Sequence, residues 1–265
     1  MSLSVAIITL DEEDNLPRCL SSVAGLADEV VVVDSLSSDR TVALAREAGA
    51  KVVEQAFLGH VRQKQLALEA CGGDWVLSLD ADEWLDESLR EAVRRIVSER
   101  DGAGTDTARA ITGYRVNRRT FYLGAWIDHC GWSPEWRLRL VRRGRAHWTG
   151  TDPHDRLETD GVVADLPGRL CHRPYRSLSE HVATVNRYTD IMAARRREAG
   201  EGGSVWRLLS RPPARFLRMY VLRAGFLDGW RGLLVASIGA YYVFLKYAKL
   251  LAAERADEGA TPPEA

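Results

Sequence analysis

The ten residues from Trp75 to Trp84, WVLSLDADEW, are the stretch from which the fold can be inferred. Five residues suited to a buried strand run directly into Asp80, Asp82 and Glu83. In an extended backbone, positions i and i+2 project to the same side, so we expect Asp80 and Asp82 to face one point. Two anions that face one point repel each other. The stretch therefore predicts a positive group beside them.

Strand and helix patterns alternate through the N-terminal part of the chain. The run LSVAIIT, residues 3–9, is typical of a strand covered on both faces, and apolar residues follow at helical spacing in 16–23. Further strand patterns occupy residues 29–34, 51–55 and 75–79. This alternation predicts an α/β fold with a mostly parallel sheet, whose ligands bind beyond the carboxyl ends of the strands. The acidic residues at those ends are Asp11, Asp34, Asp80 and Asp82.

The loop after the first strand separates the classes of α/β ligand. A dinucleotide site requires G-x-G-x-x-G at this position, and a P-loop requires G-x-x-x-x-G-K-[ST]. The chain instead has TLDEEDNL, residues 9–16, without a glycine. This argues against NAD, FAD and Walker-type ATP sites. An acidic loop can accept hydrogen bonds from a base or a ribose, while a divalent cation elsewhere offsets the charge of a diphosphate.

Composition limits the class of protein. With 265 residues, 46% hydrophobic and 28% charged, the chain can bury a full core. Its formal charge of −1 argues against a nucleic-acid partner. The four cysteines form no C-x-x-C pair, which predicts reduced thiols. The N-terminus MSLSVAIITLDEED has no basic region before its apolar run, so we interpret it as a strand and expect a cytoplasmic protein.

Six stretches of the chain carry a resemblance to a known family. They are IITLDEEDNLPRCLSSV (7–23), EVVVVDSLSSDRTVALAREAGAKVV (29–53), GDWVLSLDADE (73–83), LGAWIDHCGWSPEWRLRLVRR (123–143), HRPYRSLSEHVATVNRYT (172–189) and GFLDGWRGLLVA (225–236) with YYVFLKYAKL (241–250). In this order they resemble family 2 glycosyltransferases, specifically the subgroup that resembles lipopolysaccharide-core glycosyltransferases. The resemblance covers roughly residues 2–251.

This resemblance implies a GT-A fold, with transfer of a hexosyl or heptosyl group from a nucleotide-diphosphate sugar to a glycan or lipid-linked glycan of the cell envelope. It also implies inversion and a divalent cation, Mg²⁺ or Mn²⁺, which would act as a Lewis acid on the departing diphosphate. Where the family reads DSGSTD, this chain has DSLSSD, residues 34–39, with Leu36 in place of the glycine.

The resemblance also assigns the DXD motif. Asp82 is the expected direct metal ligand, and Asp80 binds the metal through water or binds the ribose hydroxyl. His172 completes the metal shell or is a core histidine with its hydrogen bonds satisfied. Alternatively, D-A-D only starts the following helix, where acidic residues favour the dipole. The nucleotide-binding residues that the resemblance implies are Thr9, Asp11, Glu12, Asp34, Ser35, Asp39, Lys64 and Asp80. Asp34 and Asp39 also suit turns and a helix N-cap.

The second half of the chain supplies a base. An inverting transfer needs one group to take the proton of the acceptor hydroxyl. The family pattern has a His-Glu pair that matches His154-Asp155, so Asp155 is the expected base, one methylene shorter than the usual glutamate. Asp152 is the alternative base, and a solvated turn is the alternative for the pair. Trp126 and Trp132 either stack on sugar rings or belong to the core.

The C-terminal part concentrates positive charge. Residues 187–231 hold ten arginines against four acidic residues. The stretch Gly232–Leu245 then runs without a charge, too short for an ordinary helix to cross a bilayer core of about 30 Å. These features predict an element that lies on an anionic leaflet. The resemblance implies a lipid-linked acceptor at the inner membrane, so we expect this element at the cytoplasmic face of that membrane. A buried helix with a solvated basic face is the alternative.

We expect a glycosyltransferase domain over residues 1–185, a basic and apolar helical extension over 186–251, and a disordered tail over 252–265. Two other functions stay open. A catalytically silent sugar-binding or scaffold protein would keep most of these motifs. A haloacid dehalogenase-type phosphatase also places aspartates after a strand, but its nucleophile follows the first strand with a Thr or Ser nearby, which LDADEW lacks.

Overall fold

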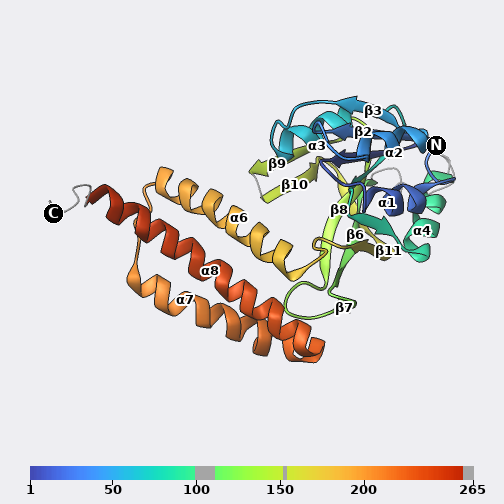
Figure 1. The fold of residues 1–265 in the computed structure, drawn as a ribbon. Coiled ribbons are helices and arrows are strands. Elements are labelled where there is room, and N and C mark those ends of the chain that lie inside the picture. The colour runs from blue at the N-terminus through green and yellow to red at the C-terminus, as the bar shows by residue number, and fades with distance from the viewer. Residues whose placement is uncertain (99–110, 152–153, 259–265) are drawn as a thin grey trace. The chain divides into compact units, whose positions relative to one another are not determined.

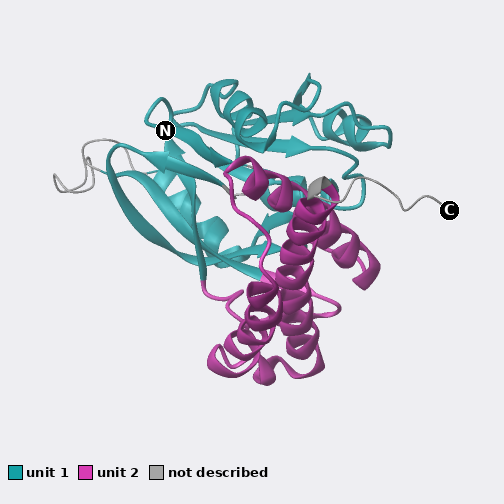
Figure 2. Cartoon of the chain, turned by 90° about the vertical axis from the view of Figure 1, so that its left-hand side faces the viewer, with its two compact units in different colours: residues 1–119, 135–173 teal, residues 120–134, 174–265 magenta. Residues whose placement is uncertain are grey.

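The computed structural model describes residues 1–98, 111–151 and 154–258. The chain forms two compact units (Figure 2). Unit 1 comprises Met1–Arg119 with Glu135–Arg173, and unit 2 comprises Thr120–Pro134 with Pro174–Ala265. Every predicted catalytic, nucleotide-binding and metal-binding residue belongs to unit 1, whereas Trp126 and Trp132 belong to unit 2.

The main sheet is mixed. Its order is β3-β2-β1-β4-β8-β6-β11-β5, and β7 pairs with β6. The first four strands in this order are parallel, and β8 joins β4 antiparallel. The strands are β1 (Leu3–Thr9), β2 (Glu29–Asp34), β3 (Lys51–Glu54), β4 (Trp75–Asp80), β5 (Glu83–Leu85), β6 (Ile111–Tyr122), β7 (Ala125–Ile127), β8 (Glu135–Arg142) and β11 (Val162–His172). The α/β prediction is confirmed, with the parallel part confined to the N-terminal strands.

Helices cover both faces of the parallel strands, as the unbroken apolar runs predict (Figure 1). Side chains alternate along β1, so Val5 and Ile7 join one core cluster and Ala6 joins the other. Helices α1, α2 and α4 contribute to the first cluster and α3 to the second. The helices of unit 1 are α1 (Leu16–Val23), α2 (Thr41–Glu47), α3 (His60–Glu69) and α4 (Glu87–Ser98).

A separate antiparallel hairpin pairs β9 (Ala146–Thr151) with β10 (His154–Thr159). Trp148 and Leu157, which face each other in its register, are buried in the core cluster that contains α3. This packing places the hairpin beside α3.

Unit 2 contains α6 (Leu178–Glu198), α7 (Val205–Leu217), a π-helical turn η1 (Arg218–Leu222), a 3₁₀ turn η2 (Gly225–Asp228) and α8 (Gly229–Glu258). Helix α8 packs along both α6 and α7 (Figure 1). The core of unit 2 includes Tyr122, Ile127, Met219, Val235 and Ala236. The end of β6 and strand β7 thus pack against the C-terminal helices.

Helix α8 changes two expectations. By length and composition alone, the described residues contain one helix able to cross a membrane, Gly225–Ala256, so the short charge-free stretch does not exclude a span. The predicted tail begins inside α8, because residues 252–258 are helical and Glu254 accepts the backbone N–H of Gly203 at 2.5 Å. Residues 259–265 lie outside the described residues. The division at residue 185 stays a prediction, although α6 runs through that position.

The four cysteines are free and buried, as the reduced-thiol prediction requires. Burial raises the pKa of Cys71 to about 12 and that of Cys171 to about 11. These thiols are therefore protonated and chemically quiet.

Candidate active site

The carboxyl ends of β1, β2 and β4 bring the first site residues together. In the parallel register Thr9 lies beside Asp34, and Ile8 lies beside Asp80. Thr9 Oγ1 donates to Asp34 Oδ2 at 2.7 Å, and Ser37 donates its N–H at 2.8 Å and its hydroxyl at 2.6 Å to the same carboxylate. Asp34 is fully buried. It therefore fixes the turn after β2, which is one of its two predicted roles.

The two acidic loops are joined by hydrogen bonds. Asp11 Oδ1 accepts the N–H of Ser38 at 2.7 Å, and Asp39 Oδ2 accepts the N–H of Glu13 at 3.1 Å. The N–H of Glu12 donates to Thr41 Oγ1 at 2.8 Å. Burial raises the pKa of Asp39, but the hydrogen bonds that its carboxylate accepts outweigh this effect and lower it overall. These carboxylates hold the loops that flank the sheet edge in one conformation.

Two residues of the predicted nucleotide set extend this edge toward α3. The N–H of Ser35 donates to the carbonyl of Thr9 at 2.9 Å, and Ser35 Oγ accepts Nε2 of Gln63 at 3.1 Å. Gln63 and Lys64 are buried neighbours on α3. Helix α3 therefore presents polar side chains to the carboxyl ends of the strands.

Lys64 supplies the positive charge that the DXD motif predicts. Its Nζ lies 2.8 Å from Asp80 Oδ1 and 2.8 Å from Asp155 Oδ2. It also lies 4.7 Å from the ring centre of Trp148. One buried ammonium therefore joins β4 to the hairpin strand β10 that carries the expected base.

A second cation completes the neutralisation of Asp80. Arg139 Nη2 lies 3.0 Å from Asp80 Oδ2 and 2.7 Å from Glu83 Oε1, and Arg118 Nη1 lies 3.1 Å from the same oxygen of Glu83. Glu83 is fully buried and Arg139 is 4% exposed. Both oxygens of Asp80 are thus engaged by cations, which does not leave it placed as a direct metal ligand.

These contacts fix the charge states of the cluster. Burial raises the pKa of Asp80, but Lys64 and Arg139 outweigh burial and hold it well below its usual range. Burial lowers the pKa of Lys64, but Asp80 and Asp155 raise it above its usual value. Burial raises the pKa of Glu135, but its contacts with Arg118 and Arg137 outweigh burial and lower the pKa to about 2. Asp80, Lys64 and Glu135 are therefore ionised at neutral pH.

Asp82 lies apart from these cations and beside His172. Strand β11 pairs antiparallel with β5, with His172 opposite Glu83, and this register places His172 Nε2 3.2 Å from Asp82 Oδ2. The side chains are 12% and 21% exposed, respectively. The DXD motif does not start a helix, because β5 follows it and Asp86 caps α4 by accepting the N–H of Leu89. That alternative for D-A-D is wrong.

The expected base lies partly outside what is described. Strand β10 begins at His154, whose side chain is outside the described residues, as is Asp152. Asp155 is 15% exposed and is held by Lys64 through Oδ2. In the described parts of the chain, no donor reaches its other oxygen, Oδ1.

Of the two tryptophans, Trp132 fits the core interpretation, whereas Trp126 is half-buried and belongs to no core cluster of the described residues. Trp132 packs against the core of unit 2, with its ring centre 5.5 Å from that of Tyr122. Trp126 lies edge-on to Phe121 at 5.2 Å.

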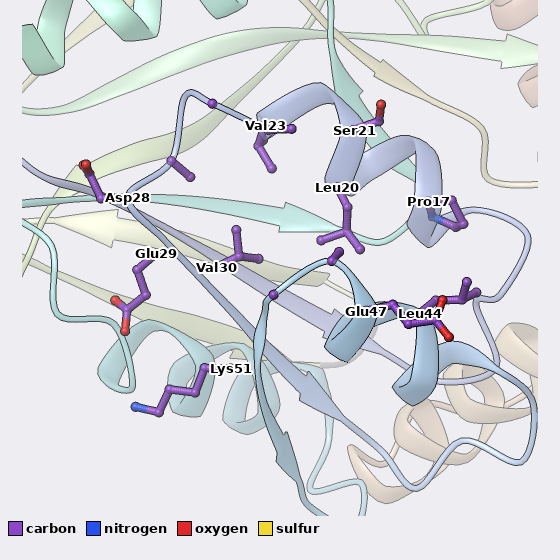
Figure 3. Close-up of a pocket in the computed structure, with 15 residues that line it drawn as sticks. Pro17, Leu20, Ser21, Val23, Asp28, Glu29, Val30, Leu44, Glu47 and Lys51 are labelled. Carbon is purple, nitrogen blue, oxygen red and sulfur yellow. The ribbon is translucent and has the colours of Figure 1, made fainter.

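A cavity of about 780 Å³ opens elsewhere in unit 1, between α1, α2 and the first residues of β2 and β3 (Figure 3). Leu20, Val30 and Leu44 line it together with Glu29 and Lys51. It lies at the amino ends of these strands, and no predicted site residue lines it. The acidic sheet edge remains the candidate site.

Comparison with known proteins identifies the family of the chain. Residues 4–158 match the family described as Glycosyl transferase family 2. The lipopolysaccharide core biosynthesis glycosyltransferase LpsC of Rhizobium meliloti is 33% identical over 262 residues, covering 94% of this chain and 92% of LpsC. The uncharacterized glycosyltransferase RT0209 of Rickettsia typhi is 31% identical, covering 94% of this chain and 86% of that protein.

A partial likeness to a solved structure is also present. Glucosyl-3-phosphoglycerate synthase from Mycobacterium tuberculosis, crystallised with Mn²⁺, UDP and glucosyl-3-phosphoglycerate, is 24% identical over 46% of this chain and 44% of its own, with a TM-score of 0.33. From the family match and the full-length relatives, the chain belongs to glycosyltransferase family 2. It is a glycosyltransferase with the predicted GT-A fold.

Arg139, Arg118 and Glu83 were not predicted from the sequence as site residues. The alternation of apolar residues and arginines in EWRLRLVRR, residues 135–143, predicts a strand with one buried apolar face, yet Trp136 is 42% exposed and Arg139 is buried on the other face. The sequence signal that could have identified these residues is the DXD motif itself. Two neighbouring carboxylates need more than one cation to neutralise them.

Proposed function

We propose that this glycosyltransferase takes its sugar from a nucleotide-diphosphate donor bound at the carboxyl ends of β1, β2 and β4. The main support for the proposal is that the two aspartates of the DXD motif have different surroundings. Asp80 is neutralised by Lys64 and Arg139, whereas Asp82 converges with His172. One carboxylate is thus part of the ion-pair cluster and the other faces a histidine.

The Asp82–His172 pair fits a divalent cation. Its 3.2 Å separation is close to the roughly 3.0 Å between adjacent ligands of an octahedral cation with bonds of about 2.1 Å. Within the described residues, no group of three or more His, Cys, Asp or Glu side chains could hold a metal ion. The chain would then supply two ligands, and diphosphate and water the others. An imidazole ligand favours Mn²⁺ over Mg²⁺, which prefers oxygen.

When bound, this cation would act as a Lewis acid that stabilises charge on the departing diphosphate. Lys64 and Arg139 would hold Asp80 ionised and oriented for a ribose hydroxyl or for water beside the cation. The proposed nucleotide-binding residues remain Thr9, Asp11, Glu12, Asp34, Ser35, Asp39, Lys64 and Asp80.

We assign the base to Asp155. Lys64 holds Oδ2, so Oδ1 is available to the acceptor hydroxyl. As the acceptor oxygen bonds to the anomeric carbon, its proton passes to Oδ1, and the bond from that carbon to the diphosphate breaks with its electron pair on the leaving group. Attack from the face opposite the diphosphate inverts the anomeric carbon. His154, which matches the histidine of the family's His-Glu pair, would contribute to catalysis beside Asp155.

The acceptor is proposed by analogy with the relative LpsC, whose name assigns it to lipopolysaccharide core biosynthesis. A lipid-linked glycan acceptor requires the enzyme to work at a membrane. We therefore place it in the cytoplasm, peripherally on the cytoplasmic face of the inner membrane, with an anionic lipid surface as a partner.

A sugar-binding protein without catalysis is the second candidate. The observation that favours it is the shorter Asp155 in place of the usual glutamate. The phosphatase alternative is not retained, because the chain belongs to family 2.

The test is a panel of nucleotide-diphosphate sugars, scored by thermal shift with and without Mn²⁺ and by release of nucleoside diphosphate. We expect one nucleotide class to stabilise the protein only with the cation, and its sugar donor to turn over. Stabilisation without any turnover, across donors and acceptors, would favour the silent sugar-binding protein. No stabilisation by any nucleotide would contradict the proposal.

A further inference from the structure

Helix α7 is amphipathic, and it leaves large apolar side chains as well as arginines in solvent. Arg207, Arg211 and Arg215 recur every fourth residue and share one face of the helix, and Arg218 continues it in η1. The Arg215 side chain lies against α8 at Gly239. Arg211, Arg215 and Arg218 are nevertheless exposed, whereas Leu208 and Phe216 on another side of α7 are half-buried.

Part of the apolar surface of α7 points to solvent. Trp206 is 77% exposed and Leu209 is 66% exposed, and no residue of α7 is buried. A helix that packed only for stability in water would bury these side chains as well. Arginine stems can cover the apolar surface of α8, but nothing in the described structure covers Trp206 and Leu209.

Exposed apolar side chains continue through the next turns. Leu222 in η1 is 79% exposed, Leu227 in η2 is 61% exposed, and Trp230 at the start of α8 is 56% exposed. We define the apolar surface of unit 2 by six residues: Trp206, Leu209, Leu217, Leu222, Leu227 and Trp230. Large apolar side chains that stay in solvent along consecutive elements indicate an interaction surface.

The charge around this surface indicates its partner. Among the described residues, Arg211, Arg215, Arg218 and Arg223 form no ion pair with a carboxylate. Two copies of the chain joined through this surface would bring two such arginine sets together, which opposes a homodimer. An anionic lipid surface instead offers phosphates to the arginines and an apolar layer to the tryptophans and leucines.

We propose that the apolar surface of unit 2 inserts into the boundary between headgroups and acyl chains of an anionic membrane. Trp206 and Trp230 would lie at headgroup depth, where tryptophan is enriched. The proposal rests on the membrane location proposed above and moves the contact to α7, η1 and η2. It replaces Gly232–Leu245 as the inserted segment, because Val235, Ala236 and Ile238 within that stretch are buried.

The test is co-sedimentation of the full chain with vesicles of phosphatidylethanolamine and phosphatidylglycerol, and with vesicles of phosphatidylcholine alone. The double variant Trp206→Ser, Leu209→Ser should bind the anionic vesicles at least about tenfold more weakly, because two apolar side chains no longer leave water. The triple variant Arg211→Gln, Arg218→Gln, Arg223→Gln should also bind weakly and lose the sensitivity to salt.

The matched control is Phe57→Ser, Leu58→Ser, which removes two exposed apolar side chains from unit 1 and should bind as the wild type does. All variants are checked for unchanged thermal unfolding. Wild-type binding by the Trp206, Leu209 variant, or no vesicle binding by the wild type, would overturn the proposal. So would a dimer in light scattering that this variant dissolves.

Quenching by bromine-labelled acyl chains gives an independent measurement of insertion. Anionic vesicles should quench part of the tryptophan fluorescence, and the variant Trp206→Phe, Trp230→Phe should lose that part while still sedimenting with vesicles. Quenching that persists in this variant would contradict insertion of the surface. Neither measurement needs donor or metal, so a failure here is distinct from failure of the nucleotide-sugar panel.

Discussion

Asp80 and Asp82 are two positions apart in sequence and have different surroundings. Asp80 is held by Lys64 and Arg139 within a buried cluster, whereas Asp82 faces His172. Removing one member of a buried ion pair leaves its partners without compensation, which costs far more than losing a surface pair. The two aspartates should therefore respond differently to substitution.

We expect Asp80→Ala to lower the free energy of unfolding by about 3 kcal/mol, because Lys64 and Arg139 would remain buried without it. Urea unfolding followed by circular dichroism measures this change. The control is Asp160→Ala, which removes a carboxylate that is 66% exposed in its pair with Arg145 and should change stability little. A loss below about 1 kcal/mol for Asp80→Ala would show that the cluster does not support the fold.

For the base, Asp155→Asn should reduce turnover by about 10²- to 10⁴-fold and leave donor affinity nearly unchanged. The amide keeps the shape of the side chain but cannot take a proton. Glu158→Gln, on the same strand and paired with Arg156 at the surface, is the control and should keep full turnover. Full turnover in Asp155→Asn with a collapse in Asp152→Asn would transfer the role to Asp152.

At the scale of elements, the turn between β2 and α2 contains a strained residue. Leu36 has φ of 65°, a left-handed conformation that costs a leucine roughly 1–2 kcal/mol and a glycine little. This explains why the family pattern has glycine at this position. The hydrogen bonds from Ser37 to Asp34 hold the turn despite the leucine.

Leu36→Gly should therefore leave the free energy of unfolding unchanged or raise it by up to about 1 kcal/mol. A glycine introduced at an ordinary position lowers it instead. The control is Leu10→Gly, a similarly exposed leucine outside the positive-φ positions, which should lose about 0.5–1 kcal/mol. Unfolding midpoints compare the two. A larger loss for Leu36→Gly than for Leu10→Gly would refute the strain.

Some helices and strands could be predicted from local sequence pattern, and some of their pairings could not. Strand β1 and helix α1 follow from the burial of Leu3–Thr9 on both faces and from the spacing of Leu16, Cys19 and Leu20. Local pattern did not predict the pairing of β11 with β5, which brings His172 to Asp82 from ninety residues away. Local pattern also did not predict that Arg139 is buried, because the burial of a charged side chain depends on its tertiary partners and not on periodicity.

At the scale of the molecule, unit 2 contains its own pH-sensitive group. The ring of His181 stacks on Tyr175 at 4.0 Å between centres, with Nδ1 2.9 Å from the hydroxyl of Tyr122. Burial lowers the pKa of His181 to about 4 from 6.5. Because the folded-state pKa is the lower one, the unfolded chain takes up the proton first as pH falls.

Stability should consequently decline between pH 6.5 and pH 4 as this histidine protonates in the unfolded state. The whole effect is about 3 kcal/mol at about 1.4 kcal/mol per pH unit. Unfolding free energies measured across this range should fall less steeply in His181→Phe than in the wild type. His147→Phe, at an exposed position, should keep the wild-type slope, and equal slopes in all three proteins would contradict the assignment.

The central claim is that Asp82 and His172 hold a cation for a nucleotide-diphosphate donor. The most direct measurement is release of nucleoside diphosphate by the wild type and by Asp82→Asn, titrated with Mn²⁺ after chelation. We predict that wild-type turnover requires the cation and that Asp82→Asn loses at least about 10²-fold at every concentration while unfolding as the wild type does. Turnover that survives chelation, or that is unchanged in Asp82→Asn, would contradict the claim.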